Sequence, residues 1–356
     1  MAAVMRVLIT GGAGFIGANV AVGLAARHPD WELLAVDNLR RSGSELNLSR
    51  LRAAGVRFRH ADVRLLDDLL ALGDAQAILE CSAEPSVLAG TDGSPDYLVR
   101  TNLLGAYHCL ELARRTGAFM LFLSTSRVYP VAPLRALRLE ETATRLALAA
   151  DQPMPGASAA GINEEFGLEG ARTLYGTTKL AAEHLIAEYR ETYGLRAVID
   201  RCGVIAGPWQ MGRVDQGVFT YWMLAHHFAR PLRYIGFGGQ GKQVRDLLHV
   251  ADLLELLDEQ LGAPERWDGT TVNVGGGADC SLSLAEATAL CVEITGRRLE
   301  IGSAAETRPG DVPHYVSDCR RLFARSTWRP RHGAREILAD IHAWIAAHEA
   351  ELAHLI

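Results

Sequence analysis

Short apolar runs alternate with helix-like stretches over roughly the first two hundred residues, and this alternation constrains the fold more than any other feature. The runs are predicted to be strands, and they lie at residues 6–9, 31–36, 56–60, 75–80, 119–123 and 196–200. Between them, stretches such as 97–115 and 178–193 have the apolar spacing of amphipathic helices. A helix between successive strands implies crossover connections, which make the strands parallel and cover both faces of the sheet. The sequence therefore predicts an α/β fold with a Rossmann-type, doubly wound parallel sheet.

The pattern becomes mixed after about residue 207, with helix-like residues at 253–257 and a final helix predicted from 334 to about 355. We expect a first domain over residues 1–205, which holds the sheet, and a smaller α/β lobe over 206–356. Residues 130–171 break the alternation with Ala, Pro, Gly and Glu. We interpret this segment as a surface excursion, either a lid over a site or an ordinary irregular loop.

A glycine-rich turn joins the first predicted strand to the first predicted helix. Gly11, Gly14 and Gly17 belong to the run Thr-Gly-Gly-Ala-Gly-Phe-Ile-Gly at residues 10–17. Glycines let the backbone turn tightly and approach a pyrophosphate, and a helix N-terminus offers N–H groups and a partial positive charge. Such a turn also occurs for purely structural reasons, so its spacing is weak evidence alone. Strand, turn and helix together nevertheless predict a dinucleotide site.

An acidic residue strengthens this prediction. Asp37 ends the second strand, about 20 residues beyond the last glycine, where a carboxylate can accept a hydrogen bond from a ribose hydroxyl. Arg40 and Arg41 follow it and would suit the 2′-phosphate of NADP. A carboxylate at the strand end repels that phosphate, so we expect NAD as the cofactor.

Three further residues have the chemistry of a proton-transfer site. Tyr175 and Lys179 are four residues apart in a predicted helix and share one of its faces. An ammonium near a phenol lowers the pKa of the phenol toward the range of a general base. Thr125 follows an apolar strand, so its hydroxyl would point into the ligand crevice, although it could simply terminate the strand. A tyrosine–lysine pair is common by chance. This pair, however, follows the dinucleotide turn at the distance along the sequence that a whole Rossmann sheet takes up. We therefore predict that Thr125, Tyr175 and Lys179 are catalytic.

Composition excludes several classes of partner. The chain is 49% hydrophobic and 22% charged with a net charge of −6, so we expect no nucleic acid and no membrane as partner. No apolar run approaches the ~20 residues of a membrane span. The six cysteines are far apart and form no C-x-x-C pair, which argues against zinc and disulfides and fits a cytoplasmic location. His226 and His227 point to different helix faces, so we predict no metal.

These motifs together resemble the extended short-chain dehydrogenases/reductases, in their nucleotide-sugar epimerase and dehydratase group. The matching segments are residues 10–17, 37–38, 62–63, 124–129, 175–179 and 245–246. The resemblance implies NAD binding by residues 1–205, mainly nucleotide-sugar binding by 206–356, and action of the tyrosine–lysine pair on a sugar hydroxyl. It implies cofactor contacts by Gly11, Gly14, Phe15, Ile16, Gly17, Asp37, Asn38, Asp62, Val63, Ser82, Ala83, Asn102, Tyr175 and Lys179.

The segments at residues 37–41, 47–48, 84–86, 215–219 and 239–249 resemble the branch of this group that inverts C2 of a deoxyhexose attached to CDP. The expected substrate contacts are Glu84, Pro85, Ser86, Thr125, Ser126, Arg213, Gln216, Arg245 and Arg308. Arginines suit a diphosphate because the guanidinium fork matches phosphate oxygens. Dehydratases of the group carry Asp-Glu after the threonine, whereas Ser126 and Arg127 follow it here. Many relatives also have an asparagine two residues beyond the arginine of the next strand, where this chain has Gly203, so that diphosphate contact is missing or replaced.

The sequence thus predicts an isomerase with NAD as cofactor and a nucleotide-diphosphate sugar, CDP-hexose favoured, as substrate. Such an epimerase oxidises a sugar carbon transiently to a ketone and then reduces its opposite face. Inversion at C4 of a UDP-sugar uses the same catalytic residues and stays open, as does a non-catalytic NAD-binding sensor. The resemblance further implies a homodimer that pairs the helices at 97–115 and 178–193.

Overall fold

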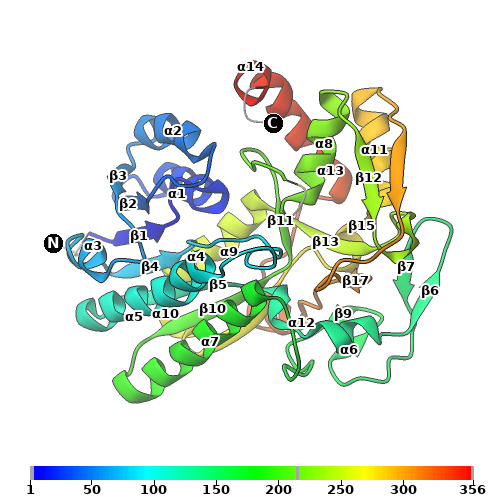
Figure 1. Ribbon diagram of the computed structural model, residues 1–356. Coiled ribbons are helices and arrows are strands. Elements are labelled where there is room, and N and C mark those ends of the chain that lie inside the picture. The colour runs from blue at the N-terminus through cyan, green and yellow to red at the C-terminus, as the bar shows by residue number, and fades with distance from the viewer. Residues whose placement is uncertain (1–3, 214–215, 354–356) are drawn as a thin grey trace. The chain divides into compact units, whose positions relative to one another are not determined.

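The computed structural model describes residues 4–213 and 216–353 (Figure 1). The chain divides into two compact units, each assembled from three segments. Unit 1 comprises Met1–Thr125, Leu174–Arg201 and Leu253–Thr271, and unit 2 comprises Ser126–Thr173, Cys202–Asp252 and Val272–Ile356. The division expected near residue 205 stays a prediction.

The central sheet belongs mainly to unit 1. Its order is β14-β10-β5-β4-β1-β2-β3, and its strands are β1 (Arg6–Thr10), β2 (Glu32–Asp37), β3 (Arg57–His60), β4 (Ala77–Glu80), β5 (Phe119–Thr125), β10 (Ala197–Cys202) and β14 (Thr270–Val274). The pairs β1–β2, β1–β4, β2–β3 and β4–β5 are all parallel. The predicted doubly wound parallel sheet is therefore confirmed. Strand order reverses beside β1, and ligands of such sheets bind at the carboxyl ends of the strands at that point.

Helices cover this sheet within unit 1. The helices of this unit are α1 (Phe15–Arg27), α2 (Asn47–Ala53), α3 (Leu66–Leu70), α4 (Asp96–Val99), α5 (Gly105–Thr116), α7 (Leu174–Tyr193), most of α9 (Val250–Gly262) and α10 (Pro264–Trp267), with short turns η1 (Ser44–Leu46) and η2 (Arg100–Leu104). Leu110 of α5 and Ile186 of α7 belong to one buried cluster with Met120 and Phe122 of β5. The single helix predicted at 97–115 is instead α4, a π-helical turn and α5.

Unit 2 has sheets and helices of its own. Its strands are β11 (Val204–Ala206), β12 (Leu232–Ile235), β13 (Val244–His249), β15 (Ser281–Ser283), β16 (Ile301–Ala304) and β17 (His314–Tyr315), and its helices are α8 (Val218–His227), α11 (Leu284–Thr295), α12 (Arg320–Arg325), α13 (Ala334–Ala347) and α14 (Glu349–Leu352). Trp222 of α8, Cys291 of α11 and Ile341 of α13 share one buried cluster. The predicted final helix ends at Ala347 and a short helix follows His348, while its last residues lie outside the described ranges.

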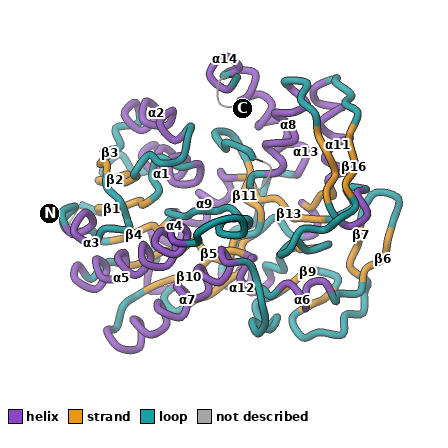
Figure 2. The backbone as a smooth tube through the Cα atoms, viewed as in Figure 1, coloured by secondary structure: helices purple, strands orange, loops and turns teal. Residues whose placement is uncertain are grey.

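The excursion at 130–171 contains regular structure, as the strands and helix in Figure 2 show. It forms α6 (Val131–Arg135), β6 (Leu139–Glu141), β7 (Leu146–Leu148), β8 (Ala157–Ser158) and β9 (Gly161–Ile162). Arg145, just before β7, donates Nη2–H to Glu286 Oε2 at 2.5 Å and Nη1–H to Ser281 Oγ at 3.1 Å. These bonds tie the β6–β7 hairpin to β15 and α11 of unit 2, so this part is not an irregular loop. Its role as a lid stays a prediction.

Two absences hold for the part of the chain that the structure describes. None of its helices has both the length and the apolar character needed to span a bilayer. No group of three or more His, Cys, Asp or Glu side chains within it is arranged to hold a metal ion.

Candidate active site

The turn between β1 and α1 has no space for side chains at its glycines. A Cβ atom on Gly17 would lie 2.3 Å from the carbonyl oxygen of Gly11, and one on Gly14 would lie 3.0 Å from the same oxygen. Gly11 itself has φ +62° and would place a Cβ 2.8 Å from the oxygen of Cys81. Gly14 caps α1 without a side-chain hydrogen bond, and the first turn contains no acidic residue. This bare helix N-terminus fits a pyrophosphate.

Asp37 at the end of β2 is bonded to this turn. Its Oδ2 accepts a hydrogen bond from the N–H of Ala13 at 3.2 Å, and its Oδ1 accepts one from the N–H of Leu39 at 2.8 Å. Burial raises the pKa of Asp37, and these backbone N–H groups oppose the rise. Asn47 donates Nδ2–H to the oxygen of Ala13 at 2.9 Å, which is a second side-chain hydrogen bond to the turn. A carboxylate has about four acceptor sites, so Asp37 retains capacity for a ribose hydroxyl.

The predicted adenine end of the site is also ordered by hydrogen bonds. Asp62 accepts from Arg64 Nη2 at 2.6 Å and from Asn38 Nδ2 at 3.0 Å. Burial alone would raise the pKa of Asp62, but these bonds lower it to about 2. Arg40 has its Cζ 4.1 Å from the centroid of the Tyr97 ring. Arg40, which could have favoured NADP, is therefore stacked on an aromatic ring of its own unit.

The loop after β4, which contains Ser82, Ala83, Glu84, Pro85 and Ser86, is tied to α7 through Asn102. Asn102 accepts from the N–H of Glu84 at 2.8 Å and donates to the oxygen of Glu84 at 3.1 Å. Its Nδ2 also donates to Thr178 Oγ1 at 3.3 Å. Thr178 lies next to Lys179, so Asn102 positions the loop relative to the predicted catalytic helix.

The three predicted catalytic residues lie on two elements of unit 1. Thr125 ends β5, while Tyr175 and Lys179 occupy the first turns of α7. Lys179 is 2% exposed, and its Nζ lies 3.2 Å from Oε2 of Glu80, which is 1% exposed. Burial would lower the pKa of Lys179, but the negative charges of Glu80 and of a Tyr175 phenolate raise it above its ordinary value. Lys179 therefore remains an ammonium, the form that stabilises a phenolate on Tyr175.

The sequence analysis missed the buried charges that support this site. Glu80 is one of them, and a second group fixes the end of β5. Glu183 of α7 accepts from Ser124 Oγ at 2.5 Å and from Arg201 Nη2 at 2.7 Å, with all three residues buried. Ser124 precedes Thr125, so this network holds the threonine in place. The available signal for these buried charges was a charged residue in a largely apolar strand, such as Glu80 in β4 and Arg201 in β10.

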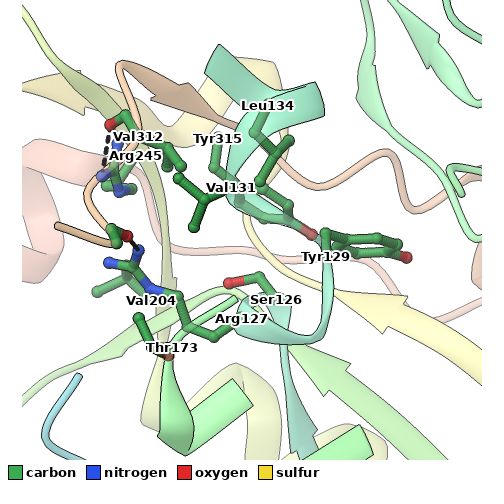
Figure 3. A pocket seen from close by; sticks show the side chains of 11 residues that line it. Ser126, Arg127, Tyr129, Val131, Leu134, Thr173, Val204, Arg245, Val312 and Tyr315 are labelled. Carbon is green, nitrogen blue, oxygen red and sulfur yellow. Dashed lines mark hydrogen bonds between the residues drawn. The ribbon is translucent and has the colours of Figure 1, made fainter. Parts of the chain in front are cut away.

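Unit 2 contains a pocket that includes two of the predicted substrate residues, Ser126 and Arg245 (Figure 3). Ser126, Arg127, Thr173 and Arg245 line it with polar groups, and its apolar wall includes Val131, Leu134, Val204 and Val312. Arg245 donates Nη2–H to Asp311 Oδ1 at 2.9 Å and to the oxygen of Val312 at 2.8 Å. Burial lowers the pKa of Arg245 to about 10.

The other predicted substrate residues of unit 2 lie in loops. The backbone oxygen of Arg308 accepts from Arg135 Nη2 at 3.1 Å. Arg213 and Gln216 exchange backbone hydrogen bonds of 2.7 and 3.2 Å across residues 214 and 215, which lie outside the described ranges. The structure thus brings Ser126 and Arg245 into one pocket and fixes the backbone of the loop that carries Arg308.

Known proteins provide an independent comparison. Residues 7–275 match the NAD dependent epimerase/dehydratase family. CDP-paratose 2-epimerase of Salmonella typhi is 28% identical over 96% of this chain and 100% of its own length. dTDP-glucose 4,6-dehydratase of Mycolicibacterium smegmatis is 29% identical over 97% and 95%. The crystal structure of Thermus thermophilus UDP-glucose 4-epimerase in complex with NAD has a TM-score of 0.78 at 26% identity, covering 96% of this chain and 99% of that one.

Proposed function

The chain belongs to the NAD-dependent epimerase/dehydratase family, and we propose that it is an epimerase that inverts one sugar carbon of a nucleotide-diphosphate sugar. The observation that carries this choice is the placement of Arg127 in the pocket of unit 2. Elimination of water needs side chains that give up and take up protons. An arginine side chain cannot be deprotonated in proteins, and a serine hydroxyl is a poor acid. Ser126 and Arg127 therefore favour epimerisation over dehydration.

The residues of unit 1 fit NAD as the cofactor. The backbone of Gly11, Gly14 and Gly17 allows close approach of a pyrophosphate, and the N–H groups of Phe15 and Ile16 open α1. Asp37 would accept from the ribose, while Asp62, Val63, Ser82 and Ala83 would lie along the adenine and nicotinamide ends. When bound, NAD supplies the hydride acceptor and donor for the sugar carbon.

The chain's own residues move the proton. Tyr175, as a phenolate, accepts the proton of the sugar hydroxyl and returns it once the opposite face has been reduced. Lys179 holds the negative charge of the phenolate, and Glu80 keeps the lysine charged in its buried position. Thr125 donates a hydrogen bond that orients the hydroxyl. The cycle is redox-neutral, because the substrate recovers the electrons that it gives up.

We favour a CDP-hexose inverted at C2, the CDP-paratose/CDP-tyvelose type of reaction. The support is the 28% identity to CDP-paratose 2-epimerase over nearly the whole of both chains. The alternative is C4 inversion of a UDP-sugar, which the resemblance to the UDP-glucose 4-epimerase structure supports. A non-catalytic NAD sensor is less favoured, because Thr125, Tyr175 and Lys179 are all present.

We also propose a homodimer that pairs α5 and α7 of two copies. Tyr193 at the end of α7 is 55% exposed and Leu104, just before α5, is 39% exposed, so both are available to a partner. Light scattering after size exclusion should give twice the chain's mass of 38.6 kDa. Elution as a monomer would contradict this pairing.

The proposed function is tested by incubating the purified protein with CDP-, UDP-, GDP- and dTDP-hexoses and following the sugar protons by NMR. We expect an inverted coupling pattern at one carbon, with the CDP-hexose turned over fastest. A 4-keto-6-deoxy product would identify a dehydratase. Unchanged spectra for all four nucleotide sugars would contradict the proposal.

A further inference from the structure

The charged side chains that line the pocket of unit 2 are all positive. Arg127 and Arg245 both line it, and none of its described lining residues is Asp or Glu. Arg127 comes from the short turn η3 (Ser126–Val128) directly after β5, and Arg245 comes from β13. Figure 3 shows both guanidinium groups on the same side of the pocket, with the hydroxyl of Ser126 also in view. The lining thus offers several N–H and O–H donors to one ligand.

The two guanidinium groups act on each other electrostatically. Burial is the largest cause that lowers the pKa of Arg245, and the negative charge of Asp311 opposes this change. The positive charge of Arg127 lowers the pKa further. Arg127 donates Nη1–H to the carbonyl oxygen of Gly310 at 3.2 Å. An anion bound between the two groups would replace their repulsion with two attractive interactions.

We propose that Arg127, together with Arg245 and Ser126, binds an oxyanion group of the nucleotide sugar. This inference rests on the proposed function, since it assigns a contact to the same substrate. Two parts of such a substrate present the required chemistry: its diphosphate, and a carboxylate on the sugar ring of a uronic acid. Both match the planar donor fork of a guanidinium. Arg127 is then a specificity-determining residue that follows the predicted catalytic threonine by two positions.

Arg127 could instead serve only to hold the loop that contains Gly310, and Arg135 provides a matched control for that role. Arg135 donates to the backbone oxygens of Asp311 at 2.8 Å and Arg308 at 3.1 Å, so it holds the same loop. It is exposed and is not part of the pocket lining. Loss of loop support alone should therefore affect Arg127→Gln and Arg135→Gln alike.

The test is isothermal titration calorimetry of the full-length wild type, Arg127→Gln, Arg127→Lys and Arg135→Gln. The probes are CDP, UDP, UDP-glucose and UDP-glucuronate. Loss of hydrogen bonds to a charged group predicts about 10- to 100-fold weaker binding to Arg127→Gln. Arg127→Lys should be intermediate, because it keeps the charge without the fork. We expect Arg135→Gln to stay within about twofold of wild type. Thermal unfolding of each variant verifies that it is folded. If Arg127→Gln is not folded, Arg127→Lys is compared with wild type instead.

Weaker binding of all four probes to Arg127→Gln would identify the diphosphate as the bound group. Weaker binding of UDP-glucuronate alone would identify a sugar carboxylate. Unchanged affinities, or an equal loss in Arg135→Gln, would overturn the proposal. These titrations need no turnover, so a protein that binds CDP through Arg127 and yet inverts no sugar would contradict the proposed function alone.

Discussion

At the scale of single residues, the buried pair of Lys179 and Glu80 is the strongest constraint on the chemistry. Both side chains are almost wholly buried, with Nζ and Oε2 3.2 Å apart. Removing one member of a buried ion pair leaves an uncompensated charge, which is far more costly than leaving the pair intact. The same pair keeps Lys179 charged beside Tyr175. In the proposed mechanism, Glu80 is therefore a positioning residue that acts through the lysine.

Replacing Glu80 should change the pH dependence of turnover. Glu80 raises the pKa of Lys179, so Glu80→Gln should lower it. Activity that needs the ammonium is present below this pKa and is lost as pH rises through it, so the alkaline limb of kcat should move to lower pH. The measurement is a pH–rate profile. Glu188→Gln, an exposed change on the same helix, should leave the profile in place. Superimposable profiles for wild type and Glu80→Gln would rule out this role.

The tyrosine itself should be needed for chemistry and dispensable for folding. Tyr175→Phe should reduce kcat by about 10²- to 10⁴-fold, because a positioned acid–base group is lost. Bound NAD, measured after denaturing the purified protein, should be retained. Tyr193 lies at the other end of the same helix and is a more exposed residue than Tyr175, so Tyr193→Phe should have little effect on kcat. A kcat near the wild-type value in Tyr175→Phe would assign the proton transfer to another group.

At the scale of elements, the β1–turn–α1 unit combines fold and function in its glycines. Gly17→Ala would place a Cβ 2.3 Å from a backbone oxygen, so the turn must open. Overpacking of this kind costs about 1–3 kcal/mol. We expect a lower midpoint of thermal unfolding and loss of NAD from the purified protein. Gly262→Ala at the end of α9 meets no atom within 4 Å and is the matched control. Normal NAD content in Gly17→Ala would show that the turn does not contact the cofactor.

The contact between β10 and α9 makes stability depend on pH. Asp200 is fully buried and accepts from Gln260 Nε2 at 3.0 Å, and burial raises its pKa from 3.8 to about 7. The folded state thus binds this proton more tightly than the unfolded state. The contribution of Asp200 to the free energy of unfolding is complete below about pH 4 and falls as pH rises toward about 7.

Urea unfolding at pH 5 and pH 8 measures this effect. The wild type should lose stability between the two pH values, and Asp200→Asn should lose less, because its amide does not titrate. Asn can still accept the hydrogen bond from Gln260. Equal losses in the two proteins would mean that Asp200 titrates normally in the fold.

The elements were largely predictable from sequence because their signals are local. The strands, the glycine turn and α7 follow from apolar periodicity and from residues next to one another in the chain. The support of the site was not predictable in this way. Glu80 meets Lys179 across 99 positions of sequence, and Ser124 meets Glu183 across 59. The interruption between α4 and α5 was also missed, because a π-helical turn keeps the composition of a helix.

At the scale of the whole molecule, the two units have different roles in the proposed reaction. Unit 1 contains the glycine turn and the proton-transfer residues, whereas unit 2 contains the arginine-lined pocket. Thr125 and Ser126 are consecutive in the chain but belong to different units. A redox-neutral reaction requires that cofactor and substrate stay bound through oxidation and reduction. Retention of NAD by the glycine turn is therefore as important to the account as the proton transfer.

Turnover in deuterated water tests the central claim most directly. The protein is incubated with its nucleotide sugar in D₂O, and the hydrogen at the inverted carbon is observed by proton NMR. Return of the same hydride predicts that this carbon keeps its protium through inversion. Stoichiometric deuterium at that carbon would contradict the account, because it would show that the carbon loses a proton to solvent.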